Sequence, residues 1–173
     1  MKRTILISVL ALAVMVAFVP IANAEMAKEG SLDGTVTYAG KHKIIPLDKD
    51  RFVIKYENFG VRVSASGGGP FHGMSTRNTG VIYFENGVGK TRGYIIYTDK
   101  DGDKVIMELN EDAAQMAPKP SSGTGEIIGG TGKFEGIQGT MEYTRRNMRP
   151  AADGTHQAVA RGTGSWKIVE PKK

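Results

Sequence analysis

The stretch Gly129-Gly130-Thr131-Gly132-Lys133-Phe134-Glu135-Gly136-Ile137-Gln138-Gly139 decides the fold of this chain. A phosphate-binding loop would need the spacing G-x-G-x-x-G or G-x-x-x-x-G-K-S/T, a preceding parallel strand and a following helix. Here three residues separate Gly132 from Gly136, and the segment from Thr140 to Thr144 alternates like a strand. The stretch therefore predicts a glycine-kinked turn between two strands, with Phe134 closing one end of a barrel.

The chain on both sides of this turn predicts short antiparallel strands. It contains 23 glycines, and the runs between them are rich in Val, Ile, Thr and Tyr, a composition typical of strands separated by turns. Asn86-Gly87 and Asp101-Gly102 favour tight hairpin turns. With no stretch suited to crossover helices, we expect an all-β fold, a closed antiparallel barrel of about eight strands. The expected strands lie at about residues 35–38, 51–57, 61–65, 81–84, 93–98, 105–109, 123–128, 136–145 and 157–169.

Two segments predict departures from regular strands. The apolar residues Val61 and Val63 have the opposite parity to Ile54 and Tyr56, and an odd shift would turn every side chain to the other face. A bulge or tight turn is therefore expected at residues 58–60. The segment from Asn110 to Ser122 is polar and contains two prolines, which predicts a long loop.

The N-terminus predicts export. Lys2 and Arg3 precede an apolar run from Ile5 to Val19, and Ala22-Asn23-Ala24 follows as an A-x-A cleavage site. Because the run is shorter than the roughly 20 residues needed to span a bilayer, a signal peptide is favoured over an uncleaved anchor. We expect a signal peptide at 1–24 and one barrel domain at 25–173, in the periplasm or secreted.

Charge and cysteine content exclude several classes of function. The chain has a net charge of +5, with two of its basic residues in the predicted signal peptide. The remaining Lys and Arg are scattered, whereas nucleic-acid binders concentrate charge on one face, so no nucleic-acid partner is expected. The chain has no cysteine, which excludes thiol catalysis, cysteine-bound metal and a lipid-modified cysteine. No later stretch is apolar enough to span a membrane after signal cleavage.

Four motifs together carry a family resemblance. The glycine stretch 129–139 closely resembles the strand-turn-strand signature of the allene oxide cyclase and dirigent superfamily, whose members are eight-stranded calycin-like barrels. With Pro70-Phe71-His72-Gly73-Met74-Ser75, the turn Asp99–Asp103 and Gly162-Thr163-Gly164-Ser165-Trp166, the chain also resembles a group of bacterial exported proteins of unassigned function.

The resemblance implies the barrel more than it implies the chemistry. Plant allene oxide cyclases use an acidic residue, an asparagine and a tyrosine inside the barrel, and these positions do not map onto this sequence. Glu135 belongs to the shared turn. The plant barrels form trimers, which leaves a homo-oligomer open here.

Strand parity names the residues that would line a pocket. Tyr56, Met141, Tyr143 and Trp166 fall on the apolar faces of their strands, and a barrel of this size holds packed side chains or one small ligand. Phe71 and His72 lie in a glycine-rich loop of the kind that caps a barrel mouth. The alternative is that the four strand residues are ordinary core and His72 is solvated. Glu108 and Glu142 have the opposite parity and should point outward.

The acidic residues Asp99, Asp101 and Asp103 alternate, which raises a calcium site as a weak alternative. An EF-hand loop would need Gly at its sixth position and Glu at its twelfth, and these are Lys104 and Asn110, so a hairpin tip is favoured. The three histidines, His42, His72 and His156, show no zinc-binding spacing. No cofactor is expected.

Two functions from different classes remain. The preferred one is a binding or interaction module without catalysis, holding a small hydrophobic molecule. The alternative is an isomerase or cyclase that confines a hydrophobic substrate inside the barrel, as in the superfamily it resembles. An interior cavity containing ionisable groups with shifted pKa values would favour the enzyme, and a purely apolar cavity would favour the binding module.

Overall fold

The computed structural model describes residues 26–114, 119–149 and 151–170. The expected signal peptide, residues 1–24, lies outside the described residues. Within them the chain forms one antiparallel sheet of nine strands and a single 3₁₀ turn. The strands are β1 (Glu29–Ser31), β2 (Gly34–Pro46), β3 (Arg51–Ser64), β4 (Ser75–Glu85), β5 (Val88–Thr98), β6 (Lys104–Ala114), β7 (Ser121–Gly130), β8 (Ile137–Asn147) and β9 (Thr155–Ile168); the 3₁₀ turn η1 is Gly132–Phe134.

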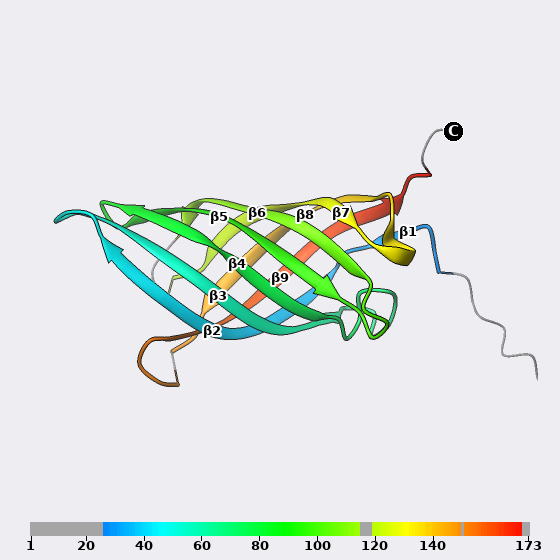
Figure 1. Cartoon of the computed structure of the whole chain (residues 1–173), viewed down its shortest axis with the longest axis horizontal. Coiled ribbons are helices and arrows are strands. Elements are labelled where there is room, and N and C mark those ends of the chain that lie inside the picture. The colour runs from blue at the N-terminus through cyan, green and yellow to red at the C-terminus, as the bar shows by residue number, and fades with distance from the viewer. Residues whose placement is uncertain (1–25, 115–118, 150, 171–173) are drawn as a thin grey trace, which may run out of the picture.

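Eight of these strands close into a barrel (Figure 1). From β2 to β9 each strand pairs with the next along the chain, and β9 returns to pair with β2. The first part of β9 pairs with β2, and its later residues 165–167 pair with the short β1. The closed eight-stranded barrel confirms the predicted fold class, and β1 is an added strand that the sequence did not predict. No helix in the described part of the chain is long and apolar enough to cross a bilayer.

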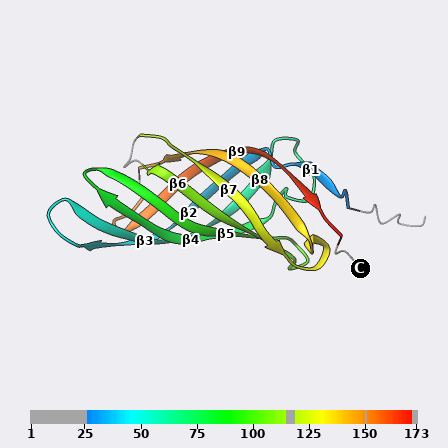
Figure 2. The ribbon, with the colours of Figure 1, turned by 90° about the horizontal axis from the view of Figure 1, so that it is seen from above.

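The two ends of the barrel differ. The β2–β3 and β4–β5 hairpins project at one end, together with the β8–β9 connection, and we call this the open end (Figures 1 and 2). At the other, the closed end, lie β1, η1 and the loops that follow β3 and β5. Each strand from β2 to β9 therefore runs from one end to the other, and the two ends are built from different loops.

Aromatic side chains fill the closed end. Phe71 enters from the loop after β3 and its ring lies 5.8–6.0 Å from the rings of Tyr97, Phe134 and Trp166. Phe134 is fully buried, as expected for a side chain that closes one end of the barrel. Leu32 and Met74 complete this packed layer.

The expected irregularity at residues 58–60 is wrong. β3 pairs in continuous register with β2 and β4 across this segment. Val61 and Val63 lie on the outer face, 45% and 49% exposed, while Arg62 is 1% exposed inside the barrel. No shift of register is needed, because Arg62 takes the inward position instead of Val61 or Val63. Its guanidinium lies 5.7 Å from the ring centre of Phe71 and donates a hydrogen bond to the Leu32 carbonyl.

The expected loop from Asn110 to Ser122 is also wrong at both ends. β6 continues to Ala114 and β7 already begins at Ser121, while residues 115–118 lie outside the described residues. Glu111, one of the polar residues behind the loop prediction, is 2% exposed and faces the barrel interior. Its polarity reflects a buried ion pair and not a surface loop.

Candidate functional site

A cavity of about 240 Å³ occupies the barrel interior between its middle and the open end. Its wall begins at Ile95 and Tyr97 and reaches Ile44 and Met148, two exposed residues at the open end. The closed-end residues Phe71, Phe134 and Trp166 take no part in this wall. Most of the wall is apolar, contributed among others by Val36, Ile54, Ile82, Phe84, Leu109 and Met141.

A buried ion pair lies within this apolar wall. Arg145 Nε and Nη2 donate to the two carboxylate oxygens of Glu111 at 2.9 and 2.8 Å. Glu111 Oε2 also accepts from Thr91 Oγ1 at 3.1 Å, and Arg145 donates to Ser121 Oγ at 3.1 Å and to Asn147. Burial disfavours the charged guanidinium, but the hydrogen bonds and charge of Glu111 outweigh it and raise the pKa of Arg145. The charges therefore satisfy each other inside the barrel.

Three tyrosines surround the ion pair. Burial, reinforced by the charge of Glu111, raises the pKa of Tyr56 to about 12. Burial likewise raises the pKa of Tyr38 and Tyr143 well above the usual range. At neutral pH the three phenols stay protonated, so they can donate hydrogen bonds into the cavity.

Glycines make room for these rings. A Cβ at Gly80 or Gly93 would lie 2.7 or 2.5 Å from the Tyr56 hydroxyl. A Cβ at Gly123 would lie 2.7 Å both from Glu111 Cγ and from Tyr143 Cζ. Large side chains on one strand are thus accommodated opposite glycines on the next, as expected inside a narrow barrel.

His156 lies at the mouth of the cavity between two amide side chains. Its Nε2 is 2.9 Å from Asn147 Oδ1 and its Nδ1 is 3.3 Å from Asn58 Oδ1. Burial, with the nearby positive charge of Arg145, lowers the pKa of His156 to about 4. The imidazole is therefore neutral at pH 7, and its one N–H donates to an amide oxygen.

The cavity wall carries an amide oxygen without a hydrogen-bond donor. Asn78 lies opposite Asn58 across β3 and β4, is buried, and lines the cavity. Its Oδ1 accepts no hydrogen bond from any residue in ranges 26–114, 119–149 and 151–170. A buried amide oxygen without a donor is costly, so this atom is available to a ligand that donates a hydrogen bond.

The structure divides the residues that the sequence predicted for a pocket. Tyr56, Met141 and Tyr143 line the cavity together. Phe71 and Trp166 pack in the aromatic layer of the closed end instead, and His72 is exposed on the loop at that end. The loop carrying Phe71 and His72 therefore covers the end of the barrel that faces away from the cavity.

Sequence reasoning missed the polar half of the cavity. Arg145 shares the inward parity of Met141 and Tyr143, and Glu111 shares that of Leu109, so strict alternation was a signal for both. The same alternation would also have identified Tyr38 on β2 and His156 on β9 as inward-facing residues. The misleading assumption was that charged residues mark the outer face, which holds for Glu142 but not for Glu111.

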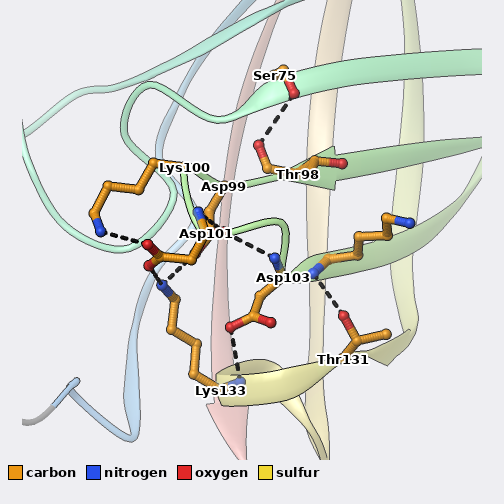
Figure 3. A network of polar contacts seen from close by, with 9 residues as sticks. Ser75, Thr98, Asp99, Lys100, Asp101, Asp103, Thr131 and Lys133 are labelled. Atoms are coloured by element: carbon orange, nitrogen blue, oxygen red, sulfur yellow. Dashed lines mark hydrogen bonds and ion pairs between the residues drawn. The ribbon is translucent and has the colours of Figure 1, made fainter.

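The acidic turn between β5 and β6 is tied to the glycine turn (Figure 3). The ammonium of Lys133 contacts Asp99 and lies 2.9 Å from Asp101 Oδ2, and the Lys133 backbone N–H donates to Asp103 Oδ2 at 3.2 Å. Hydrogen bonds from Lys100 and Lys133 lower the pKa of Asp101 to about 2. Lys133, which belongs to the glycine motif, thus provides a positive charge beside Asp99 and Asp101, where the calcium alternative would place the metal ion. Within the described ranges, no group of three or more His, Asp or Glu side chains is arranged to hold a metal ion.

Comparisons with known proteins show the fold alone. No family model matches the chain, and neither does any curated protein. Among solved structures, the pterocarpan synthase dirigent protein GePTS1 superposes with a TM-score of 0.51 at 11% identity, over 82% of this chain and 93% of that one. A second pterocarpan synthase dirigent protein, PsPTS1, gives 0.47 at 10% identity over 84% and 99% of the two chains. This protein therefore shares the eight-stranded barrel fold of dirigent proteins.

Proposed function

We propose that this barrel is a binding module that holds one small, largely apolar molecule in its interior without transforming it. The observation that carries the proposal is the cavity of about 240 Å³, walled mainly by aliphatic and aromatic side chains and reaching the open end of the barrel. Small-molecule sites typically combine such apolar walls with a few placed polar groups.

The polar groups specify the kind of molecule that fits. Because Glu111 and Arg145 neutralise each other, neither is left to pair with a charged ligand, and we infer that the ligand is uncharged. Asn78 Oδ1 calls for a hydrogen-bond donor on the ligand, and the phenols of Tyr38 and Tyr143 can donate to an oxygen of the ligand.

Binding can be tested with a neutral apolar dye such as N-phenyl-1-naphthylamine, whose fluorescence rises in an apolar site. We expect saturable binding by the wild type and a loss of at least tenfold in affinity for Ile82→Trp, which places an indole in the cavity. The matched control is Ile128→Trp, on an exposed position away from the cavity. Equal affinity in the two variants would exclude the interior as the site.

One observation favours a second candidate, an isomerase or cyclase. The cavity contains ionisable groups with shifted pKa values, Tyr56 at about 12 and His156 at about 4, beside a buried ion pair. Groups of this kind gather at catalytic sites. Protonated phenols could polarise a carbonyl or epoxide oxygen of a substrate held in the cavity.

The two candidates differ in what happens to a ligand identified by its co-purification with the protein. If the barrel only binds, prolonged incubation returns the molecule unchanged in mass and chromatographic retention. If it catalyses, an isomer of the same mass accumulates beyond one equivalent per barrel, and Tyr143→Phe slows its formation.

We also propose that the barrel acts outside the cytoplasm, as the N-terminal sequence predicts. Expression of the full chain with its natural N-terminus should yield a mature protein that begins at Glu25. N-terminal sequencing of the purified protein checks this, and a mature chain that retains residues 1–24 would contradict it.

A further inference from the structure

The open end of the barrel exposes a group of apolar side chains around the cavity mouth. We call these residues the apolar rim; each is 40–54% exposed, and they are Ile44, Ile45, Leu47, Val88 and Met148. Ile44 and Met148 also line the cavity, so the rim continues the apolar wall outward. Exposed apolar groups gathered at one place mark interaction sites more often than scattered ones do.

Most of the rim lies on a projecting ribbon. β2 pairs with β9 only as far as Lys41, so residues 42–46 pair with β3 alone. Figures 1 and 2 show this hairpin extending from the open end. Ile44 and Ile45 lie on opposite faces of the ribbon, and Leu47 follows at its turn. β3 stays paired with β4 along this hairpin, so the free backbone edge is that of β2. Exposed apolar side chains beside a free strand edge favour association with a partner.

The same ribbon concentrates positive charge. Residues 41–55 contain five basic and two acidic residues, a net charge of +3 against +5 for the whole chain. Asp48 and Asp50 are already paired, with Arg51 and Lys49. Lys43 and Lys55 lie directly opposite each other, and neither forms an ion pair with a carboxylate in the described ranges. Like charges in this position repel, and an anionic partner would relieve the repulsion.

We propose that the open end docks on the surface of an anionic lipid bilayer. Ile45 and Leu47 enter the boundary between headgroups and acyl chains, while Lys43 and Lys55 contact lipid phosphates. A second copy of this chain would bring the two positive ribbons together. Addition of a strand to the free edge of β2 is opposed by Lys43 and by Pro46, which has no N–H. If the proposed ligand binding holds, the cavity mouth then faces the lipid, and an apolar ligand enters without crossing water.

Co-sedimentation with vesicles tests the docking. The wild type is expected to bind vesicles containing about one third phosphatidylglycerol, and to bind them more weakly as salt rises. Vesicles of phosphatidylcholine alone should bind it much less. Ile45→Ser/Leu47→Ser should weaken partitioning at least tenfold, and Lys43→Glu/Lys55→Glu at least about fivefold for each charge removed.

Matched controls alter the same residue types elsewhere. Val61→Ser/Val63→Ser removes exposed apolar side chains from the outer face of β3, and Lys104→Glu/Lys167→Glu reverses two charges at the closed end. Both should bind vesicles like the wild type. The altered positions are exposed, and circular dichroism with thermal unfolding confirms that each variant is folded.

A fluorescent reporter gives the orientation. Leu47→Trp places an indole at the tip, and Ile128→Trp places one at an exposed site outside the rim. The native Trp166 is buried and contributes the same background emission in both variants. Anionic vesicles should shift the emission of Leu47→Trp to shorter wavelength, and brominated lipids should quench it. Neither should happen with Ile128→Trp.

Three results would overturn docking: no binding of the wild type to anionic vesicles, equal losses in the control variants, or a dimer in light scattering that only Ile45→Ser/Leu47→Ser dissociates. Dye binding is also measured in the absence of vesicles, which distinguishes a failure of docking from a failure of ligand binding. Vesicle binding without dye binding would leave docking standing and sink the ligand proposal. Dye binding without vesicle binding would do the reverse.

Discussion

Arg145 and Glu111 place two opposite charges in a barrel interior whose other walls are mostly apolar. Taking both out of water is expensive, and their mutual attraction and added hydrogen bonds offset that cost only while both are present. The contacts from Arg145 to Ser121 and from Thr91 to Glu111 hold four strands, β5 to β8, around the pair. The pair is therefore a structural element of the cavity wall as well as a source of its electrostatics.

Removing one charge should destabilise the fold strongly. Glu111→Gln keeps the shape of the side chain but leaves Arg145 buried without a counter-charge, and the free energy of unfolding should fall by about 3–5 kcal/mol. Its control is Asp112→Asn, next in sequence, which breaks a solvated ion pair with Arg92 and should change stability far less. Urea unfolding at pH 7 measures both, and similar losses would contradict a buried role for the pair.

His156 predicts a dependence of stability on pH. Its pKa is about 4 in the folded chain and about 6.5 when unfolded. As pH falls from 6.5 to 4, the unfolded chain takes up a proton that the folded chain does not, so the free energy of unfolding falls through this window. His156→Gln should lose less stability than the wild type between pH 7 and 4.5. Parallel curves for the two proteins would show that His156 is not protected from protonation.

At the scale of elements, the glycine motif joins two turns of the closed end. Gly132 has a φ of +57°, and a Cβ there would lie 2.0 Å from Asp103 Oδ1. Thr131 adds a reciprocal pair of hydrogen bonds with Lys104, each 2.9 Å long. The motif therefore holds the β7–β8 turn against the β5–β6 turn.

Gly132→Ala should cost about 1–3 kcal/mol of stability, because alanine is strained at this φ and its Cβ collides with Asp103. The matched control is Gly129→Ala, where a Cβ meets no atom within 4 Å. Thermal unfolding of the two variants checks the difference. A control that melts as early as Gly132→Ala would mean that glycine is needed for flexibility along the whole stretch.

The elements themselves were largely predictable, although β1 was missed and β2 and β4 are longer than the expected strands 35–38 and 81–84. The errors in β3 and β6 share one cause. Alternation and Asn-Gly or Asp-Gly turns located the strands from β2 to β9. β3 and β6 were misread because both carry a charged residue inward, Arg62 and Glu111. Parity assigned by hydrophobicity fails where a strand places polar groups inside and apolar groups such as Val61 outside.

At the scale of the whole molecule, the barrel separates a packed end from a hollow one. The rings of Phe71, Tyr97, Phe134 and Trp166 fill the closed end, while the cavity lies toward the other end. Stability and binding should therefore respond to different substitutions.

Phe71→Ala tests this separation. It removes a buried ring and should lower the free energy of unfolding by about 3–5 kcal/mol, while dye affinity measured below the melting range stays at the wild-type value. The complementary variant, Ile82→Trp, should lower affinity and leave stability nearly unchanged. If Phe71 contacts the ligand, as the sequence predicts, Phe71→Ala will weaken dye binding as well.

The amino-acid sequence determined the fold class, because glycine-punctuated alternation is a local property and an antiparallel barrel is the arrangement that leaves no edges. It also named Tyr56, Met141 and Tyr143 as inward residues. Only the tertiary structure decided that Glu111 meets Arg145, that Phe71 and Trp166 belong to the packed end, and which end stays open. Those outcomes depend on strand register and on contacts between residues far apart in the chain, and local alternation carries no information about either.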